Sequence, residues 1–162
     1  MVTQDSPITN EKNEKHTFSL LYVPFRLFVS SDFSLLVTAL VDKGSETSLV
    51  RRGLIPDKYF YKAERPINFV AANRTAVKGG QRELNCQMHL EGIDPDTGVA
   101  QSLQIPFVCR DADIGGGDVV LSYRWLAEHH IDVLPKRHGL MVLREEGPVW
   151  VNGTKNYTGV LL

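Results

Sequence analysis

The chain has 162 residues and a net charge of −1, and 43% of its residues are hydrophobic and 23% charged. This length suits one domain with a substantial core, and the balanced charge argues against a nucleic-acid or membrane-surface partner. The N-terminus lacks the apolar core of a signal peptide, no apolar run is long enough to span a membrane, and the two cysteines suit a reducing compartment. We therefore expect a cytoplasmic or otherwise intracellular protein.

The N-terminal part is expected to be a tail followed by a β-hairpin. Residues 1–16 are polar without periodicity, which predicts a flexible tail, and residues 17–162 are expected to form a single domain. An apolar stretch at residues 18–28 is interrupted by Pro24, which favours a strand at the edge of a sheet. A turn at residues 30–32 leads into a second strand at residues 33–41.

The next segment carries charges, a short helical turn and a candidate hairpin. Arg51 and Arg52 form an isolated pair and are predicted to be solvated. Pro56 and Asp57 can begin a helical turn. Residues 66–84 are typical of strand, polar turn and strand, with a glycine pair that permits a bulge.

Two further strands are predicted at residues 85–92 and 99–109, with a turn at residues 94–98 between them. The turn contains the triplet Asp96-Thr97-Gly98, and Glu91, Asp94 and Asp96 form an acidic trio in and beside it. Pro95 precedes the triplet and no apolar strand leads into it, so we expect a surface turn. The acidic residues lack the ligand spacing of a calcium loop.

The C-terminal third is predicted to contain the only helix of the chain. After a loop at residues 111–117, an apolar strand reaches Ser122, which can cap a helix that carries Trp125, Leu126 and His129 on one face. A strand is expected at residues 140–143. The alternation before Asn152-Gly153 predicts a hairpin or edge strand at the C-terminus.

The most informative stretch lies at residues 36–50. An apolar strand ends at Asp42, Gly44 follows two positions later, and a second apolar run begins at Leu49. A buried strand that places a single carboxylate on a tight turn is costly, because an unpaired buried charge is strongly unfavourable. Such a carboxylate is therefore a candidate catalytic group.

Asp42, Gly44 and Ser45 resemble the active-site loop of retropepsin-like aspartic proteases from long-terminal-repeat retroelements, whose pattern is apolar-Asp-(Thr or Ser)-Gly-(Ala or Ser). The stretch at residues 118–126 resembles the apolar pair and Trp-Leu helix of the same family, with Ser122 where glycine is usual. The resemblance covers roughly residues 25–142. It implies an all-β, closed retropepsin-like barrel of short strands, with a flap hairpin and one short helix near the C-terminal part.

The resemblance also implies a function. Family members cleave polyproteins as homodimers without a cofactor or metal, each chain supplying one catalytic aspartate, here Asp42. The two carboxylates share a proton, so that one activates water and the other hydrogen-bonds the scissile carbonyl. The hairpin after the active-site loop would be the flap over the substrate, placing flap residues among Ala71, Ala72, Asn73, Gly79 and Gly80.

Lys43 departs from the family pattern, which has a buried hydroxyl residue that hydrogen-bonds across the two-fold axis. Two lysines at the axis would repel each other, and a nearby positive charge would favour ionisation of both aspartates. Unless Lys43 points outward, we expect weak or absent catalysis. The alternative function is a catalytically inactive dimerisation or peptide-binding module, and a further alternative is a monomeric β-domain without a cleft.

Other chemistries fit the sequence less well. His129, His130 and His138 with Asp132 match no established metal-ligand spacing, and adjacent histidines on a helix point apart. Cys86 and Cys109 lack the local signature of a nucleophilic cysteine, and we expect them to be small apolar residues.

Overall fold

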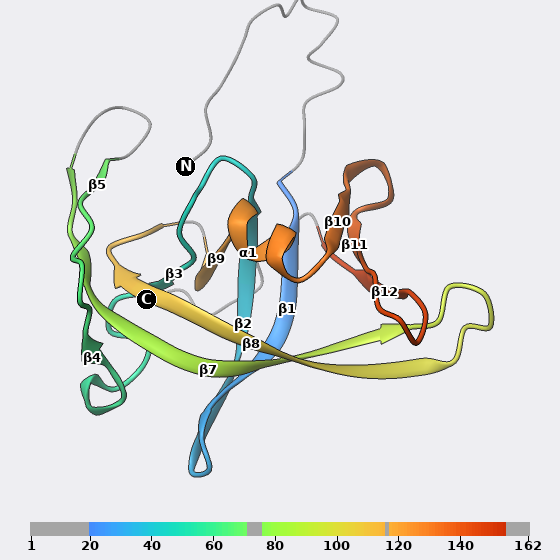
Figure 1. Ribbon diagram of the computed structural model, residues 1–162, viewed down its shortest axis with the longest axis horizontal. Helices are drawn as coiled ribbons and strands as arrows, with labels where there is room; N and C mark the ends of the chain where they lie inside the picture. Colours follow the sequence, from blue (N-terminus) through green and yellow to red (C-terminus); the bar gives the residue numbers. More distant parts are fainter. Residues whose placement is uncertain (1–19, 71–75, 116, 155–162) are drawn as a thin grey trace, which may run out of the picture.

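A closed ring of six strands forms the centre of the fold. The computed structural model describes residues 20–70, 76–115 and 117–154. In the ring β1, β2, β9, β3, β8 and β7 are neighbours in that order, and β7 also pairs with β1 (Figure 1). The elements are β1 (Tyr22–Ser30), β2 (Phe33–Asp42), β3 (Leu49–Arg51), η2 (Asp57–Tyr59), β4 (Tyr61–Lys62), β5 (Phe69–Val70), β6 (Ala76–Val77), β7 (Gly79–Ile93), β8 (Ala100–Ala112), β9 (Val119–Ser122), α1 (Tyr123–Glu128), β10 (Ile131–Leu134), η3 (Pro135–Arg137), β11 (Gly139–Val142) and β12 (Val149–Asn152).

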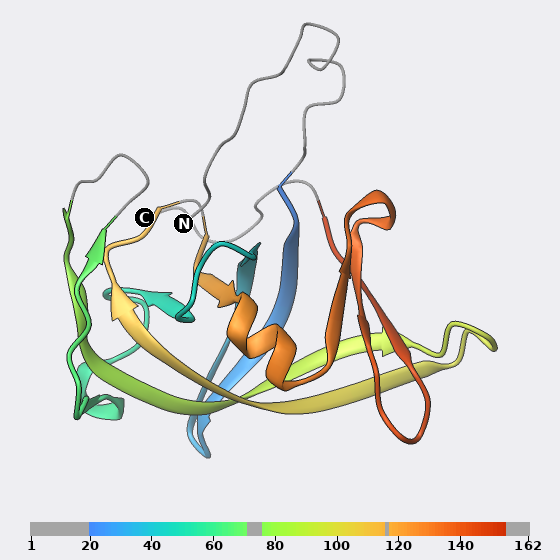
Figure 2. The same ribbon diagram turned by 45° about the horizontal axis from the view of Figure 1, so that its top comes forward.

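The predicted all-β barrel with one short α-helix is thus confirmed. The long β7–β8 hairpin runs across the lower part of the molecule in the view of Figure 1 and crosses the β1–β2 hairpin, as Figures 1 and 2 show. Side chains alternate along β8, so that Leu103, Ile105, Phe107 and Cys109 face the core. Period-two alternation of this kind is what one buried sheet face requires.

The surface turn predicted at residues 94–98 is also confirmed. Asp94 organises it, because its Oδ1 accepts hydrogen bonds from the N–H groups of Asp96 at 2.8 Å and Thr97 at 3.2 Å. Asp96, Thr97 and Gly98 are exposed. The Asp-Thr-Gly triplet at residues 96–98 is therefore a surface turn remote from the core.

The first strand, expected at the edge of a sheet, has a second neighbour over part of its length. β1 is a member of the closed ring, because Arg26, Leu27 and Phe28 pair with β7. Pro24 lies before that paired stretch and faces Thr38 of β2. Its missing N–H therefore removes no bond from the β1–β7 ladder.

Helix α1 packs its predicted apolar face into the core. Ser122 is the N-cap, and its hydroxyl accepts a hydrogen bond from the N–H of Trp125 at 3.1 Å. Trp125 and Leu126 are buried, and the Trp125 ring meets the Phe107 ring edge to face at 5.8 Å. The described residues include no helix that is long and apolar enough to span a membrane.

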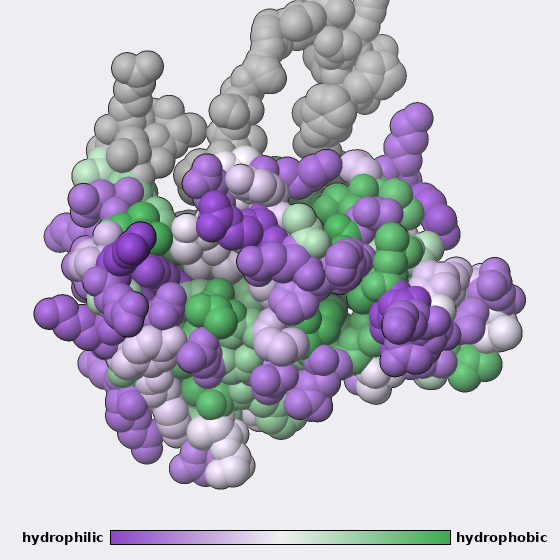
Figure 3. Space-filling model, in the orientation of Figure 1, coloured by the Kyte–Doolittle hydropathy of each residue, from purple (hydrophilic) through white to green (hydrophobic). Residues whose placement is uncertain are grey.

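The C-terminal region differs from the prediction. β10, β11 and β12 form an antiparallel meander, and β10 was not expected from the sequence. Of the two alternatives predicted for the C-terminus, the edge strand is wrong, because β12 lies between β11 and β7, with Trp150 opposite Ile93; β12 instead forms an antiparallel hairpin with β11. The meander extends the sheet beyond the ring, and hydrophobic surface gathers over the β10–β11 hairpin (Figure 3).

Candidate active site

Asp42 is the last residue of β2, which neighbours the middle strand of the three adjacent strands β2, β9 and β3. β2 runs parallel to β9 with Asp42 opposite Ser122, and β3 lies antiparallel on the other side of β9 with Leu49 opposite Val120. The chain therefore leaves β2 at Asp42, passes over the end of β9 through residues 43–48 and returns as β3. This topology fixes both ends of the loop on the same strand.

The carboxylate of Asp42 is held in a defined direction. The residue is 1% exposed, and its Oδ1 accepts a hydrogen bond from the N–H of Gly44 at 2.9 Å. The N–H of Ser45 bonds to the Asp42 carbonyl oxygen at 3.1 Å and closes the turn. The predicted loop residues Gly44 and Ser45 thus orient the acid, whereas the Lys43 side chain is exposed on the single chain.

The far part of the loop is attached to the start of α1. The Ser45 hydroxyl donates to the Thr47 carbonyl oxygen at 2.9 Å, and the N–H of Tyr123 bonds to the Ser45 carbonyl oxygen at 3.0 Å. These bonds connect the acid-bearing turn to the first residue of the helix.

A pair of buried serines provides a second attachment that the sequence analysis missed. The Ser48 hydroxyl donates to the Ser122 hydroxyl at 3.1 Å and accepts from the Ser122 N–H at 3.1 Å. Ser122 also caps α1, so both of its roles need the hydroxyl that glycine lacks. The departure from the family pattern at Ser122 therefore has a structural reason in Ser48.

A buried ion pair on the opposite side of the loop was also missed. Asp118 is 2% exposed; its Oδ2 accepts from the Thr38 N–H at 2.9 Å, and its Oδ1 accepts from Arg51 Nη2 at 3.0 Å. The prediction that Arg51 is solvated is wrong, because 15% of its side chain is exposed. Arg52 is 45% exposed, as expected of a surface charge. Asp118 joins β2, β9 and β3, the three strands that position Asp42.

A two-stranded hairpin stands beside the loop where the flap was expected. β5 pairs with β6, with Phe69 opposite Val77. The predicted flap residues Ala71, Ala72 and Asn73 lie outside the described residues. Gly79 and Gly80 lie at the base of the hairpin, where the β7–β8 register shifts and the predicted bulge is confirmed.

Both glycines are required by their backbone conformation and surroundings. Gly79 has φ +127° and Gly80 has φ +87°. A Cβ on Gly79 would lie 2.4 Å from the Ala112 Cα, and one on Gly80 would lie 2.2 Å from the Ile67 carbonyl oxygen. The pair therefore lets the hairpin approach the end of β8 and the residues before β5.

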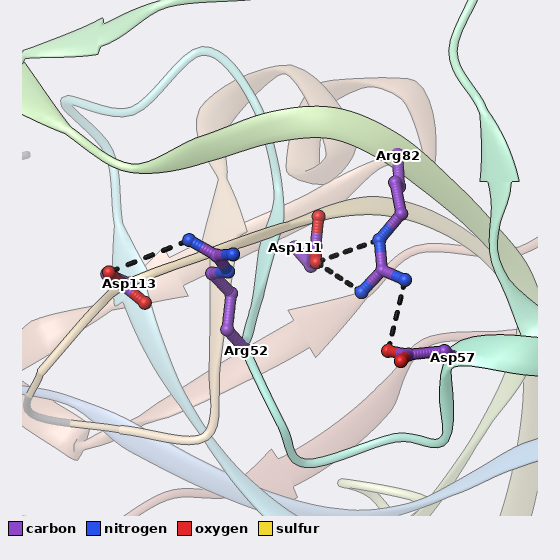
Figure 4. A network of polar contacts seen from close by, with 5 residues as sticks. All are labelled: Arg52, Asp57, Arg82, Asp111 and Asp113. Atoms are coloured by element: carbon purple, nitrogen blue, oxygen red, sulfur yellow. Dashed lines mark hydrogen bonds and ion pairs between the residues drawn. The ribbon is translucent and has the colours of Figure 1, made fainter.

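An ion-pair network secures the base of this hairpin (Figure 4). Arg82 on β7 donates to the buried Asp111 carboxylate at 2.7 Å and to Asp57 at 3.0 Å. These contacts, with Asp111 first, raise the pKa of the Arg82 guanidinium. Arg52 lies 3.7 Å from Asp113 beside it. Asp111, predicted to begin a loop, belongs to the end of β8.

A cleft of 540 Å³ separates the hairpin from the Asp42 loop. Its walls come from residues 44–49 of the loop, residues 67–69 and Val77 of the hairpin region, and residues 113–115 after β8. Gly44 and Ser45, which follow the catalytic candidate Asp42 by two and three positions, line it. An extended peptide in this cleft would lie against the turn that carries Asp42.

The alternative sites do not assemble. Among the described residues no three His, Cys, Asp or Glu side chains form a group able to hold a metal ion. His129 instead packs on Trp125, with ring centroids 5.0 Å apart, and burial lowers its pKa. Cys86 and Cys109 are free and buried, and burial raises the pKa of Cys109 well above its ordinary value.

Comparison with known proteins identifies the fold. No family model matches the chain, and neither does any curated protein. Among solved structures, it resembles the retroviral protease-like domain of Ddi1 from Leishmania major, with a TM-score of 0.54 and 18% identity, over 84% of this chain and 94% of that domain. The fold is retropepsin-like. At this identity the likeness concerns the fold alone.

Proposed function

We propose that this chain is a retroelement-type aspartic endopeptidase that processes a polyprotein as a homodimer, with Asp42 of each copy as the catalytic carboxylate. The observation that carries the proposal is the buried Asp42 side chain, oriented by the Gly44 N–H on a loop that borders a cleft. A buried carboxylate is costly unless the structure uses it, and peptide hydrolysis is the use that this fold and loop support best.

A second copy would complete the chemistry. Only one loop of the sequence matches the active-site pattern convincingly, the loop at Asp42, and acid proteolysis needs two carboxylates that share one proton. In a symmetric dimer each loop meets its own image. One Asp42 carboxylate would remove a proton from water as the water attacks the scissile carbonyl, while the protonated partner hydrogen-bonds the carbonyl oxygen. The two acids titrate as a pair.

The hairpin formed by β5 and β6 would act as the flap. It stands across the 540 Å³ cleft from the Asp42 loop, and Phe69 and Val77 line the cleft from its side. A bound peptide would thus lie between the hairpin and the loop, with water excluded from the reacting bond.

Lys43 favours a second candidate, an inactive dimerisation or peptide-binding module with the same fold. In the dimer Lys43 lies next to Asp42 at the proposed two-fold axis, where like charges repel and a shared proton is disfavoured. We therefore propose that Lys43 reduces the activity of the wild-type enzyme.

Cleavage of a hydrophobic peptide library between pH 4 and 7 tests the proposal. Lys43→Thr is expected to raise both dimerisation and cleavage, since relief of buried like charge is worth about a few kcal/mol. Adding Asp42→Asn is expected to abolish cleavage. A Lys43→Thr protein that forms dimers but cleaves nothing would support the inactive module, and sedimentation that stays at 18.2 kDa at high concentration would overturn the dimer.

A further inference from the structure

The charged residues that line the 540 Å³ cleft are all acidic. Among the described residues that line it, only Glu46 and Asp113 carry charge. Asp113 lies 3.7 Å from Arg52, so its charge is partly compensated. Glu46 is exposed, and its carboxylate makes no hydrogen bond or ion pair with the described residues. Glu46 therefore contributes to the cleft a negative charge that no described residue pairs with.

Glu46 also borders a second depression, on the α1 side of the same loop. This cavity of 280 Å³ is lined by Glu46 and Ser48, by Arg124, Trp125 and Glu128 of the helix, and by Arg110 of β8. The Glu46 carboxylate thus stands between two neighbouring hollows rather than at the closed end of one. Strongly hydrophilic surface covers the β2–β3 loop in Figure 3. Because Arg110 and Arg124 line the smaller hollow, a cationic side chain of a peptide would approach Glu46 from the 540 Å³ cleft, where it need not be fully desolvated.

The opposite wall of the cleft is apolar. Phe69, Val77 and Ile114 are partly buried against the small core cluster of Leu49, Ala112 and Val120. Phe69, Val77, Ile114 and Leu49 also line the cleft. A large aliphatic or aromatic side chain placed against this wall would remove its own apolar surface and that of the wall from water.

We propose that this cleft selects peptides in which a bulky apolar side chain is accompanied by a lysine or arginine whose charge meets Glu46. The apolar wall binds the bulky apolar side chain, and the Glu46 carboxylate binds the lysine or arginine. This inference rests on the proposed function, because it assumes that a peptide occupies the cleft. It goes further by naming Glu46 as the residue that determines charge specificity.

The test uses fluorogenic peptides with one fixed apolar core and a single position, moved along the peptide, that holds Lys, Gln or Glu. Cleavage is measured for the full chain carrying Lys43→Thr, with Glu46→Gln and Glu46→Lys in that background. Glu145→Gln is the matched control, since this exposed carboxylate lies between β11 and β12 and lines neither cavity. Anisotropy of the same peptides carrying a dye measures binding independently of cleavage.

We expect a two- to fivefold preference for Lys over Gln at one position, the size of an exposed ion pair, which decreases as salt is added. Glu46→Gln removes the preference, Glu46→Lys reverses it in favour of Glu peptides, and Glu145→Gln leaves it unchanged. The reversal is a gain for acidic peptides, which a misfolded variant cannot produce.

Two failures are distinguishable. Peptides that are bound or cleaved with the same charge preference in the Glu46 variants would overturn the role of Glu46 while the proposed function stands. A chain that neither binds nor cleaves any peptide of the panel would overturn both.

Discussion

Removing the buried Asp118 carboxylate is expected to destabilise the fold strongly. In Asp118→Ala the Arg51 guanidinium, 15% exposed, loses its anionic partner, and the buried Thr38 residue loses an acceptor for its N–H. Breaking one side of a buried ion pair costs about 3–5 kcal/mol, against a total stability of about 5–15 kcal/mol for a domain. The loss therefore takes up a large share of the stability of the barrel.

A double-mutant cycle separates the ion pair from the hydrogen bond. Asp118→Asn keeps an oxygen for the Thr38 N–H and should cost about 1–3 kcal/mol, because the Arg51 guanidinium loses its ion pair with the Asp118 carboxylate. Arg51→Met removes the same ion pair from the side of the buried Asp118 carboxylate. The Arg51→Met/Asp118→Asn double variant removes both charges, and its loss should be smaller than the sum of the two single losses by about 1–3 kcal/mol.

Urea unfolding followed by tryptophan fluorescence provides the measurement, at one fixed protein concentration because association shifts apparent stability. A loss below about 1 kcal/mol for Asp118→Ala would refute the reasoning. So would single losses that simply add in the double variant, since they would show that Asp118 and Arg51 do not stabilise each other.

Three further outcomes follow from the core and from the base of the hairpin. Burial lowers the pKa of His129 below 6.5, so the unfolded chain binds more protons; stability should fall as pH drops through 6.5 toward the lower folded value, and His129→Gln should weaken this fall in unfolding assays at pH 5 and 7.5. Gly80→Ala should cost about 1–3 kcal/mol in thermal unfolding because of its φ of +87° and the Ile67 carbonyl oxygen, whereas exposed Gly98→Ala, also at positive φ but with nothing near its Cβ, should cost less. Cys109 is buried with a raised pKa, so iodoacetamide should modify it only in denaturant; rapid labelling of the native chain would contradict its placement.

Local patterns predicted the elements whose structure depends on nearby residues. The turn signal at residues 94–98 helped to predict the β8 strand, and the Asp-x-Gly sequence predicted the turn in which the Gly44 N–H bonds to Asp42. The strand and the turn both depend on residues that are close together in the sequence. The same reasoning predicted the Ser122 cap, since its partner Trp125 is three residues away.

The features that the sequence did not reveal depend on distant partners. Arg51 is separated from Asp118 by 67 residues, and Ser48 is separated from Ser122 by 74 residues. Nothing near Arg51 distinguishes it from solvated Arg52. The short segment Ile131–Leu134 becomes β10 only because β11 pairs with it. Buried polar contacts of this kind are decided by the topology that brings three strands together.

The central claim is that two Asp42 carboxylates act as one catalytic pair. A crystal structure of the chain with a peptide mimic that carries a hydroxyl in place of the scissile carbonyl tests this directly. The account predicts a symmetric dimer in which both Asp42 carboxylates lie within hydrogen-bonding distance, about 3 Å, of that single hydroxyl. A monomer, or a dimer formed through another face with the two Asp42 residues apart, would contradict it.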